Sequence, residues 1–241
     1  MYCSHCGKPY AAGDAFCENC GLKIEAQGYA PQPHAYVPPM QGSSRMLVVL
    51  LIEASDSAAA YYQKMVAHLS KFVLDVSGDS MAQNAVDMAI VQFNESMSVL
   101  PELPDITNTG YVPYIRGSSS FHPPIMEAVR MAKEHSTSFP GAFKPWVIML
   151  SSGHPADDIS HASYEIQNMQ GADMLRFMAL SVDGLNAAFL KRLTDVVFTQ
   201  QGHDFGAFFG WLGECVKTIV RTPPGMKPQL PQLTGNVYRV R

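Results

Sequence analysis

The segment Met46-Leu-Val-Val-Leu-Leu-Ile52 is an uninterrupted apolar run, and the polar sequence Glu53-Ala-Ser-Asp-Ser57 follows it directly. A strand buried on both faces of a parallel sheet has this continuous apolar character. We therefore predict a central strand at residues 46–52. Its polar continuation is expected at the carboxyl end of the sheet, where the ligand sites of open α/β folds lie.

Apolar segments with strand spacing and helix spacing alternate along the chain on the C-terminal side of this strand. Such alternation predicts a doubly wound, mostly parallel α/β sheet with helices on both faces. The predicted strands are residues 46–52, 86–93, 145–150, 174–182 and an edge strand at 196–198, and the predicted helices are residues 57–75, 124–135, 159–169, 187–193 and 205–220.

Four of the five cysteines lie near the N-terminus as two Cys-x2-Cys pairs, Cys3 with Cys6 and Cys17 with Cys20, and a glycine follows each pair. Two such turns can complete a tetrahedral shell of four thiolates around Zn²⁺, with Zn–S distances near ~2.3 Å. We predict a zinc ribbon over residues 1–25, in which the zinc is structural because the closed shell leaves no position for water. Two disulfides are the alternative, and they require an oxidising compartment.

Proline-rich composition separates this ribbon from the main domain. Residues 26–45 are predicted to be a semi-rigid linker, and residues 222–241 a second proline-rich, extended tail. The α/β domain is accordingly predicted at residues 46–221.

Charge and hydropathy exclude several classes of function. The chain has 17 Lys and Arg against 21 Asp and Glu, a net charge of −4, which disfavours nucleic acid as a partner. The run at residues 46–52 is far shorter than the roughly 20 apolar residues of a membrane span. Cys3 and Cys6 stand where the basic and apolar regions of a secretory signal would be, so we expect a cytoplasmic protein that does not contact membranes.

Three polar loops flank the predicted strand ends and helix starts: Glu53-Ala-Ser-Asp-Ser57, Gly117-Ser-Ser-Ser120 and Ser151-Ser-Gly-His-Pro155. Their order and spacing resemble the von Willebrand factor A (vWA) domain over residues 45–221. In that family the first strand ends in Asp-x-Ser-x-Ser, a middle loop supplies a Thr, and a later strand ends in Thr-Asp-Gly. Together these residues form a metal-ion-dependent adhesion site (MIDAS), which usually holds Mg²⁺.

Two further segments are similar to the bacterial tellurium-resistance vWA proteins of the TerY type. Lys144-Pro-Trp-Val-Ile-Met-Leu-Ser-Ser-Gly-His-Pro155 resembles their Arg-Pro-Trp-x-x-x-x-Thr-Asp-Gly-x-Pro strand, and Phe205-Gly-Ala-Phe-Phe-Gly-Trp-Leu212 resembles their closing helix. The resemblance implies a cytoplasmic stress-response or phage-defence system. It also implies protein partners, among them protein kinases and protein phosphatases.

The adhesion-site motif is altered in this chain. By position, the residues that correspond to it are Glu53 for the first Asp, Ser55 and Ser57 for the two hydroxyl ligands, Ser119 or Ser120 for the Thr, and Ser152 for the Asp of Thr-Asp-Gly. Mg²⁺ demands near-octahedral oxygen ligands at ~2.0–2.1 Å. Glutamate reaches one methylene further than aspartate, and a serine in place of the second aspartate removes a negative charge. We therefore expect divalent-ion binding at this degenerate MIDAS to be weak or absent.

Alternatives to that interpretation stay open at this point. A working Mg²⁺-dependent ligand site is one, and serines that cap helices and satisfy loop backbone are another. His122, His154 and His161 lie near the same rim, and we expect them to be solvated.

Enzymatic and nucleic-acid-binding functions are the rival classes. Gly78-Asp79-Ser80-Met81 is similar to the start of some serine esterases, but no apolar strand precedes Ser80, so we predict a turn there. A nucleic-acid-binding zinc protein has support only from the ribbon, and the net charge opposes it. We predict a non-catalytic protein-interaction module.

Overall fold

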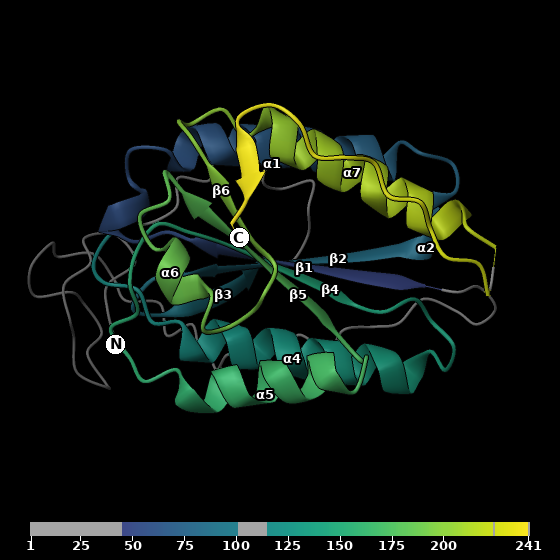
Figure 1. The fold of residues 1–241 in the computed structure, drawn as a ribbon, viewed down its shortest axis with the longest axis horizontal. Helices are drawn as coiled ribbons and strands as arrows, with labels where there is room; N and C mark the ends of the chain where they lie inside the picture. The colour runs from purple at the N-terminus through teal and green to yellow at the C-terminus, as the bar shows by residue number, and fades with distance from the viewer. Residues whose placement is uncertain (1–44, 101–114, 224, 241) are drawn as a thin grey trace, which may run out of the picture. The chain divides into compact units, whose positions relative to one another are not determined.

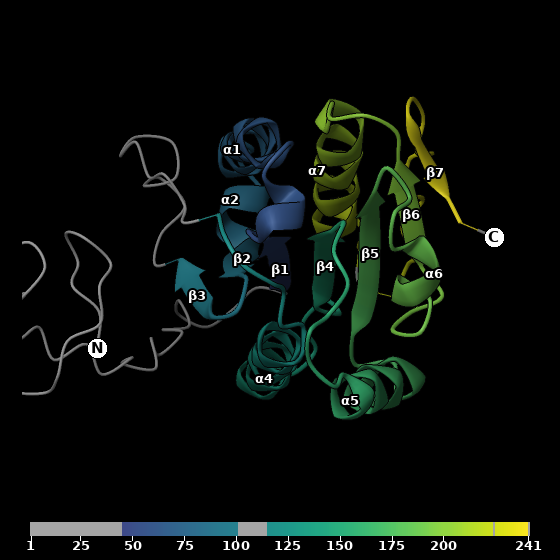
Figure 2. The ribbon, with the colours of Figure 1, turned by 90° about the vertical axis from the view of Figure 1, so that its left-hand side faces the viewer.

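The computed structural model describes residues 45–100, 115–223 and 225–240, which form a seven-stranded sheet with helices on both faces (Figures 1 and 2). The strand order is β3-β2-β1-β4-β5-β6-β7. The strands are β1 (Met46–Glu53), β2 (Val86–Phe93), β3 (Met97–Leu100), β4 (Trp146–Ser151), β5 (Arg176–Val182), β6 (Val197–Gln200) and β7 (Val237–Arg239). The predicted doubly wound, mostly parallel α/β fold is confirmed. The predicted ribbon, with Cys3, Cys6, Cys17 and Cys20, lies outside the described residues.

The strand predicted from the opening apolar run is the central one. β1 pairs in parallel with β2 on one side and with β4 on the other, and all eight of its residues are buried. Side chains alternate between the faces of a strand, and β1 accordingly contributes to two separate cores. Val48, Leu50 and Ile52 belong to one core, and Leu47, Val49 and Leu51 belong to the other.

Two long helices cover each face of the sheet. α1 (Tyr62–Ser77) and α7 (Gly206–Arg221) pack on one face, while α4 (His122–Ser138) and α5 (Ser160–Gly171) pack on the opposite face (Figure 2). Three short helical segments lie in the connections, η1 (Asp56–Ala58), α2 (Ala82–Ala85) and α6 (Ala187–Leu190). The helix predicted to begin at residue 57 begins at Tyr62, because the preceding residues form the short 3₁₀ turn η1.

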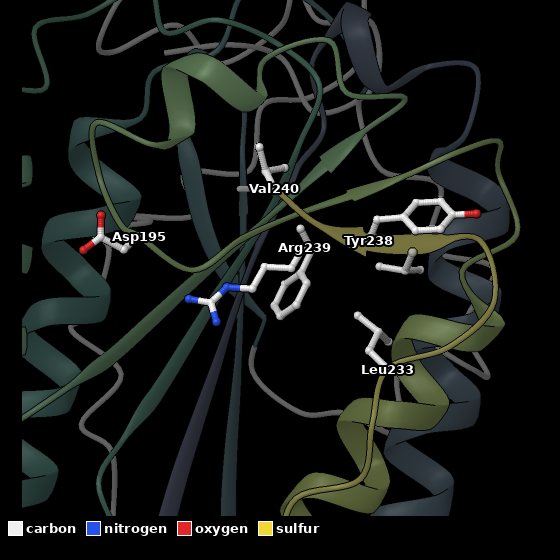
Figure 3. A pocket seen from close by; sticks show the side chains of 7 residues that line it. Asp195, Leu233, Tyr238, Arg239 and Val240 are labelled. Carbon is white, nitrogen blue, oxygen red and sulfur yellow. The ribbon is translucent and has the colours of Figure 1, made fainter.

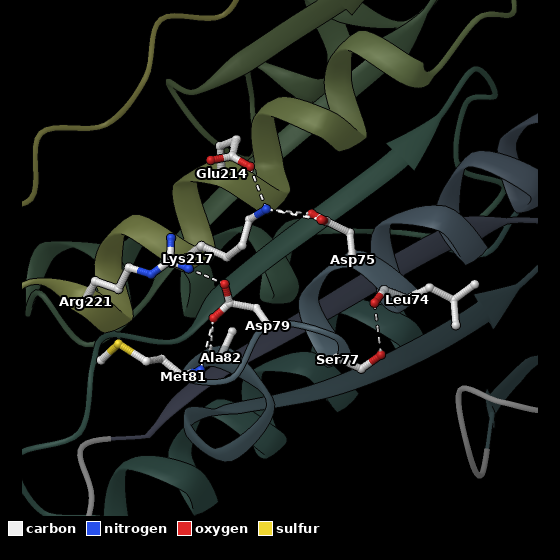
Figure 4. A network of polar contacts seen from close by, with 9 residues as sticks. All are labelled: Leu74, Asp75, Ser77, Asp79, Met81, Ala82, Glu214, Lys217 and Arg221. Carbon is white, nitrogen blue, oxygen red and sulfur yellow. Dashed lines mark hydrogen bonds and ion pairs between the residues drawn. The ribbon is translucent and has the colours of Figure 1, made fainter.

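Ion pairs join the two helices that share the first face (Figure 4). Lys217 of α7 is only 8% exposed, and its Nζ lies 2.9 Å from an Asp75 carboxylate oxygen of α1. Arg221 pairs with Asp79, whose carboxylate also accepts the backbone N–H groups of Met81 and Ala82. Asp79 therefore holds the turn between α1 and α2 against α7, so the predicted turn at Gly78-Asp79-Ser80 is confirmed.

The C-terminal segment completes the sheet. Residues 237–239 form β7, which pairs antiparallel with β6, so the prediction that residues 196–198 form an edge strand is wrong. The Trp211 indole N–H of α7 donates to the Pro231 carbonyl at 2.9 Å, which fixes the path of the tail along that helix. β3, antiparallel to β2 at the other edge, was also not predicted. Both edge strands have at most four residues, too few for a clear periodicity.

Candidate functional site

The polar loops meet at the carboxyl ends of the two central strands. Ile52 of β1 is in register with Leu150 of β4, so Glu53 and Ser151 follow side by side at the same edge of the sheet. A third loop reaches them through a bridge between Ser119 and Pro155. Glu53 has no exposed surface in this arrangement, although carboxylates are almost never fully buried unless they are paired.

One oxygen of the Glu53 carboxylate is the meeting point of three hydroxyl groups. Ser55 Oγ donates to Oε1 at 2.6 Å and Ser57 Oγ donates to it at 2.7 Å. Ser119 Oγ, from the loop before α4, donates to the same oxygen. The structure thus brings together three of the predicted serines, and it selects Ser119 over Ser120. The Ser120 backbone N–H donates instead to the Asn94 carbonyl at 2.8 Å.

The other carboxylate oxygen is held by the loop that follows β4. Ser151 Oγ donates to Glu53 Oε2 at 2.7 Å, and the backbone N–H groups of Ser152 and Gly153 donate to it at 2.8 and 3.0 Å. With three donors on each oxygen, the carboxylate accepts six hydrogen bonds. Six donors are more than the roughly four lone-pair sites of a carboxylate, so both oxygens are satisfied by neutral groups alone.

Ser152, predicted to take the place of an aspartate at the site, has its side chain elsewhere. Its Oγ lies 3.0 Å from the Ser57 carbonyl oxygen and 3.1 Å from the Tyr61 hydroxyl, and it hydrogen-bonds to both. Only its backbone N–H contacts Glu53. The helix-capping interpretation is wrong for Ser55, since that residue makes no side-chain cap hydrogen bond to η1.

A further buried polar layer orients Ser151. Asn186 Nδ2 donates to Ser151 Oγ at 3.0 Å and to the Gly153 carbonyl at 2.6 Å, and Ser181 Oγ donates to Asn186 Oδ1 at 2.6 Å. All of these side chains are buried. Sequence reasoning missed Ser151, Ser181 and Asn186. The available signal was one serine near the carboxyl end of each of the strands β4 and β5, next to apolar residues.

Gly153 is required by the close approach of the carboxylate. A Cβ atom at this position would lie 2.3 Å from Glu53 Oε1 and 2.7 Å from Ser57 Oγ, closer than real Cβ contacts. The glycine therefore lets the β4 loop fold directly over the acid, and it places its own N–H within hydrogen-bond distance of Oε2.

The hydrogen bonds keep Glu53 ionised despite its burial. Burial alone raises the pKa of a carboxyl group, because it disfavours the charged form. The hydrogen bonds from Ser119, Ser55, Gly153 and Ser57 together outweigh burial and hold the pKa of Glu53 below its ordinary value. The site is thus a buried carboxylate surrounded by neutral donors.

This lowered pKa predicts a specific acid sensitivity. The stabilising contribution of Glu53 is fully present above the ordinary glutamate pKa of about 4.3, and it is lost as the pH falls further through the lower folded-state pKa. We expect the melting temperature of the wild-type chain to fall more steeply below about pH 4 than that of Glu53→Gln, which has no carboxyl group to titrate. Circular dichroism melts across this range measure both slopes, and parallel slopes would contradict the assignment.

The residues present do not fit Mg²⁺. The three serine hydroxyls converge on Glu53 Oε1, so the donor set at this point is one carboxylate and three neutral hydroxyl groups. A Mg²⁺ site needs oxygen ligands at ~2.0–2.1 Å with lone pairs aimed at the ion.

A separate hollow of about 800 Å³ lies at the outer edge of the sheet, beside β7 (Figure 3). Phe198, Leu233, Val237 and Val240 form its apolar lining, and Asp195, Tyr238 and Arg239 add polar groups. It shares no residue with the Glu53 site, and three strands separate β7 from β1. Its lining contains no serine, cysteine or histidine.

Comparison with solved structures identifies the class of fold. The chain is similar to the pilus adhesin SpaC from Lactobacillus rhamnosus GG, with a TM-score of 0.62, 10% identity and coverage of 75% of this chain but 31% of SpaC. It is also similar to the vWF domain of the type V pili tip protein Mfa5 from Porphyromonas gingivalis, with a TM-score of 0.56, 12% identity and coverage of 76% of this chain and 98% of that domain. The described part of the chain thus has a vWA-like fold.

The N-terminal segment has its own match. Residues 2–24, which contain Cys3, Cys6, Cys17 and Cys20, match the model of a zinc-ribbon domain. A search of curated proteins gave no match. None of the helices in the described ranges is long and apolar enough to cross a bilayer. The chain therefore combines a zinc-ribbon segment with a vWA-like α/β domain.

Proposed function

We propose that this chain is a non-catalytic protein-interaction module that binds a protein partner at the carboxyl ends of β1, β4 and β5 without a divalent ion. The observation that supports this proposal is the Glu53 carboxylate, which is fully buried and accepts six hydrogen bonds. The exposed residues of the loops around it include Asp56, Ser57, His154 and Leu185. Such a surface recognises a partner by shape and hydrogen bonding.

The same contacts argue against catalysis at this site. A serine nucleophile needs a base that takes its proton while the oxygen faces a substrate. Ser55 and Ser119 are buried and donate to a carboxylate whose remaining acceptor positions are already used. At the esterase-like segment, Asp79 is occupied by two backbone N–H groups and by Arg221, so it does not activate Ser80.

The setting we propose is a cytoplasmic bacterial stress-response system of the tellurium-resistance kind, or a related phage-defence system. The TerY-like sequences around Trp146 and at Phe205–Leu212 support this proposal. Within it, the protein partners include a protein kinase and a protein phosphatase. The N-terminal ribbon, with Zn²⁺ on Cys3, Cys6, Cys17 and Cys20, serves as a second docking element whose metal is structural.

Co-purification of partners with the tagged full-length chain from bacterial cells tests the proposal. We expect the same partners in the same amounts in magnesium-free buffer and with added MgCl₂, because the site has no place for the ion. A chelator is avoided, since it would also compete for the zinc of the ribbon. Partner recovery that requires MgCl₂, together with calorimetric Mg²⁺ binding that Ser57→Ala abolishes, would instead support a working ion-dependent site.

Two leucines of similar exposure, Leu185 and Leu74, test which surface of the domain binds the partner. Leu185 is 66% exposed and follows the carboxyl end of β5. Leu74 is 61% exposed and lies in the last turn of α1, away from the carboxyl ends of the strands. We expect Leu185→Glu to reduce partner recovery and Leu74→Glu to leave it unchanged. The reverse result would move the binding surface away from the Glu53 site.

A further inference from the structure

Two histidines at the starts of the neighbouring helices α4 and α5 lie against each other. His122 is the first residue of α4, and His161 is the second residue of α5. Their ring nitrogens Nε2 and Nδ1 are 3.3 Å apart, with the ring centroids 5.5 Å apart and the planes inclined by 35°. α4 and α5 pack side by side along one face of the sheet (Figure 2), and this packing holds the pair together.

This spacing matches that of two ligands on one tetrahedral ion. With Zn–N bonds of about 2.0–2.1 Å and a tetrahedral angle, two ligand nitrogens lie about 3.3–3.4 Å apart. His161 is exposed and His122 is partly exposed, so both rings have room to rotate and direct their lone pairs at a common point. Imidazole is a preferred ligand of Zn²⁺ and a poor one for Mg²⁺.

Nearby carboxylates offset the positive ends of the two helices. The Asp157 carboxylate accepts the backbone N–H groups of Phe121 and His122 at 2.8 and 2.9 Å, at the start of α4. Asp158 accepts the hydroxyl and backbone N–H of Ser160 at the start of α5. Hydrogen bonds from Ser160 hold the pKa of Asp158 below its usual range, so this carboxylate is ionised at neutral pH. A cation at the histidine pair therefore has anionic neighbours.

We propose that His122 and His161 form a two-imidazole binding site for Zn²⁺ on the rim of the α/β domain. The site is separate from the predicted ribbon zinc and from Glu53, and it does not depend on the function proposed above. Since the described residues contain no third His, Cys, Asp or Glu arranged as a ligand, the remaining coordination positions are left to water. An ion with open positions of this kind can accept a donor side chain from a bound protein.

Calorimetric titration of the full-length, zinc-loaded chain with ZnCl₂ tests this site. We expect uptake of additional zinc beyond the ribbon equivalent, retained in the presence of excess MgCl₂. Uptake is expected to be lost in both His122→Ala and His161→Ala. His154→Ala is the matched control, because His154 is an exposed histidine of the same rim that contacts the ring of Phe189 rather than another imidazole. We expect it to bind zinc like the wild type.

Three results would overturn the proposal: no additional zinc uptake, uptake that survives both alanine variants, or uptake that falls equally in His154→Ala. Thermal melting in the absence of added zinc checks that the variants are folded. The backbone N–H of residue 122 is present in the alanine variant and can still donate to Asp157, so its melting temperature should match that of the wild type. EPR of added Cu²⁺ gives an independent readout, in which nitrogen hyperfine structure should disappear with either histidine.

Discussion

Replacing Glu53 with alanine is expected to lower the free energy of unfolding of the α/β domain by about 3–5 kcal/mol, the usual cost of removing one member of a buried charged network. Six donors would lose their acceptor at once, and Ser55, Ser119 and Ser151 are too buried to turn to water. For a domain of this size, such a loss corresponds to a decrease in melting temperature of about 6–20 °C. Thermal unfolding of the purified variant measures it.

Glu95→Ala is the matched control for Glu53→Ala. Glu95 is an exposed glutamate near the same rim, and its hydrogen bonds from Ser118 are long, at 3.3 and 3.4 Å. We expect its melting temperature to stay close to that of the wild type. Glu53→Gln should be nearly as destabilising as Glu53→Ala, because its amide NH₂ would face N–H and O–H donors. A Glu53→Ala protein that melts like the Glu95→Ala protein would show that the carboxylate is not held as described.

Replacing Cys17 with serine is expected to remove the zinc from the N-terminal segment without changing the melting of the α/β domain. Structural zinc supplies about 10–16 kcal/mol in small zinc-binding peptides, and a segment of this size has too little apolar surface to fold without it. Elemental analysis should show the loss of zinc. Limited proteolysis should then cleave the chain N-terminal to the α/β domain, while the thermal transition of that domain is retained.

His5→Ala is the control for this experiment, since His5 lies between Cys3 and Cys6 but is not one of the four predicted ligands. We expect it to retain the zinc of the wild type. Unchanged zinc content in Cys17→Ser would contradict the four-cysteine site. Loss of the ribbon and of the main thermal transition together would mean that the two parts fold as one unit.

The five parallel strands and the part of the site formed by Glu53, Ser55 and Ser57 could be predicted because their signals are local. The apolar runs at β1 and β4 define the strands, and the spacing of Glu53, Ser55 and Ser57 places them in one loop. Sequence spacing also indicated the loop of Ser119, although it did not decide between that residue and Ser120. These features depend on parallel strands that end at the same edge of the sheet.

The remainder of the site depends on contacts between distant segments. Ser151 contacts Glu53 from a neighbouring strand, and Asn186 reaches both Ser151 and the Gly153 carbonyl from the loop after β5. Tyr61 lies within the helix predicted at residues 57–75, and a helical pattern gives no signal for its hydrogen bond to Ser152. Likewise, the pairing of His122 with His161 exists only because α4 and α5 pack together.

The short strands at the two edges of the sheet affect how copies of this chain can associate. β3 and β7 both run opposite to the five strands between them, and they contain four and three residues. Short edge strands expose few unpaired backbone N–H and C=O groups with which a strand of another copy could pair. We therefore expect the described edges of the sheet to disfavour strand-to-strand association when many copies of this chain are held together in one assembly.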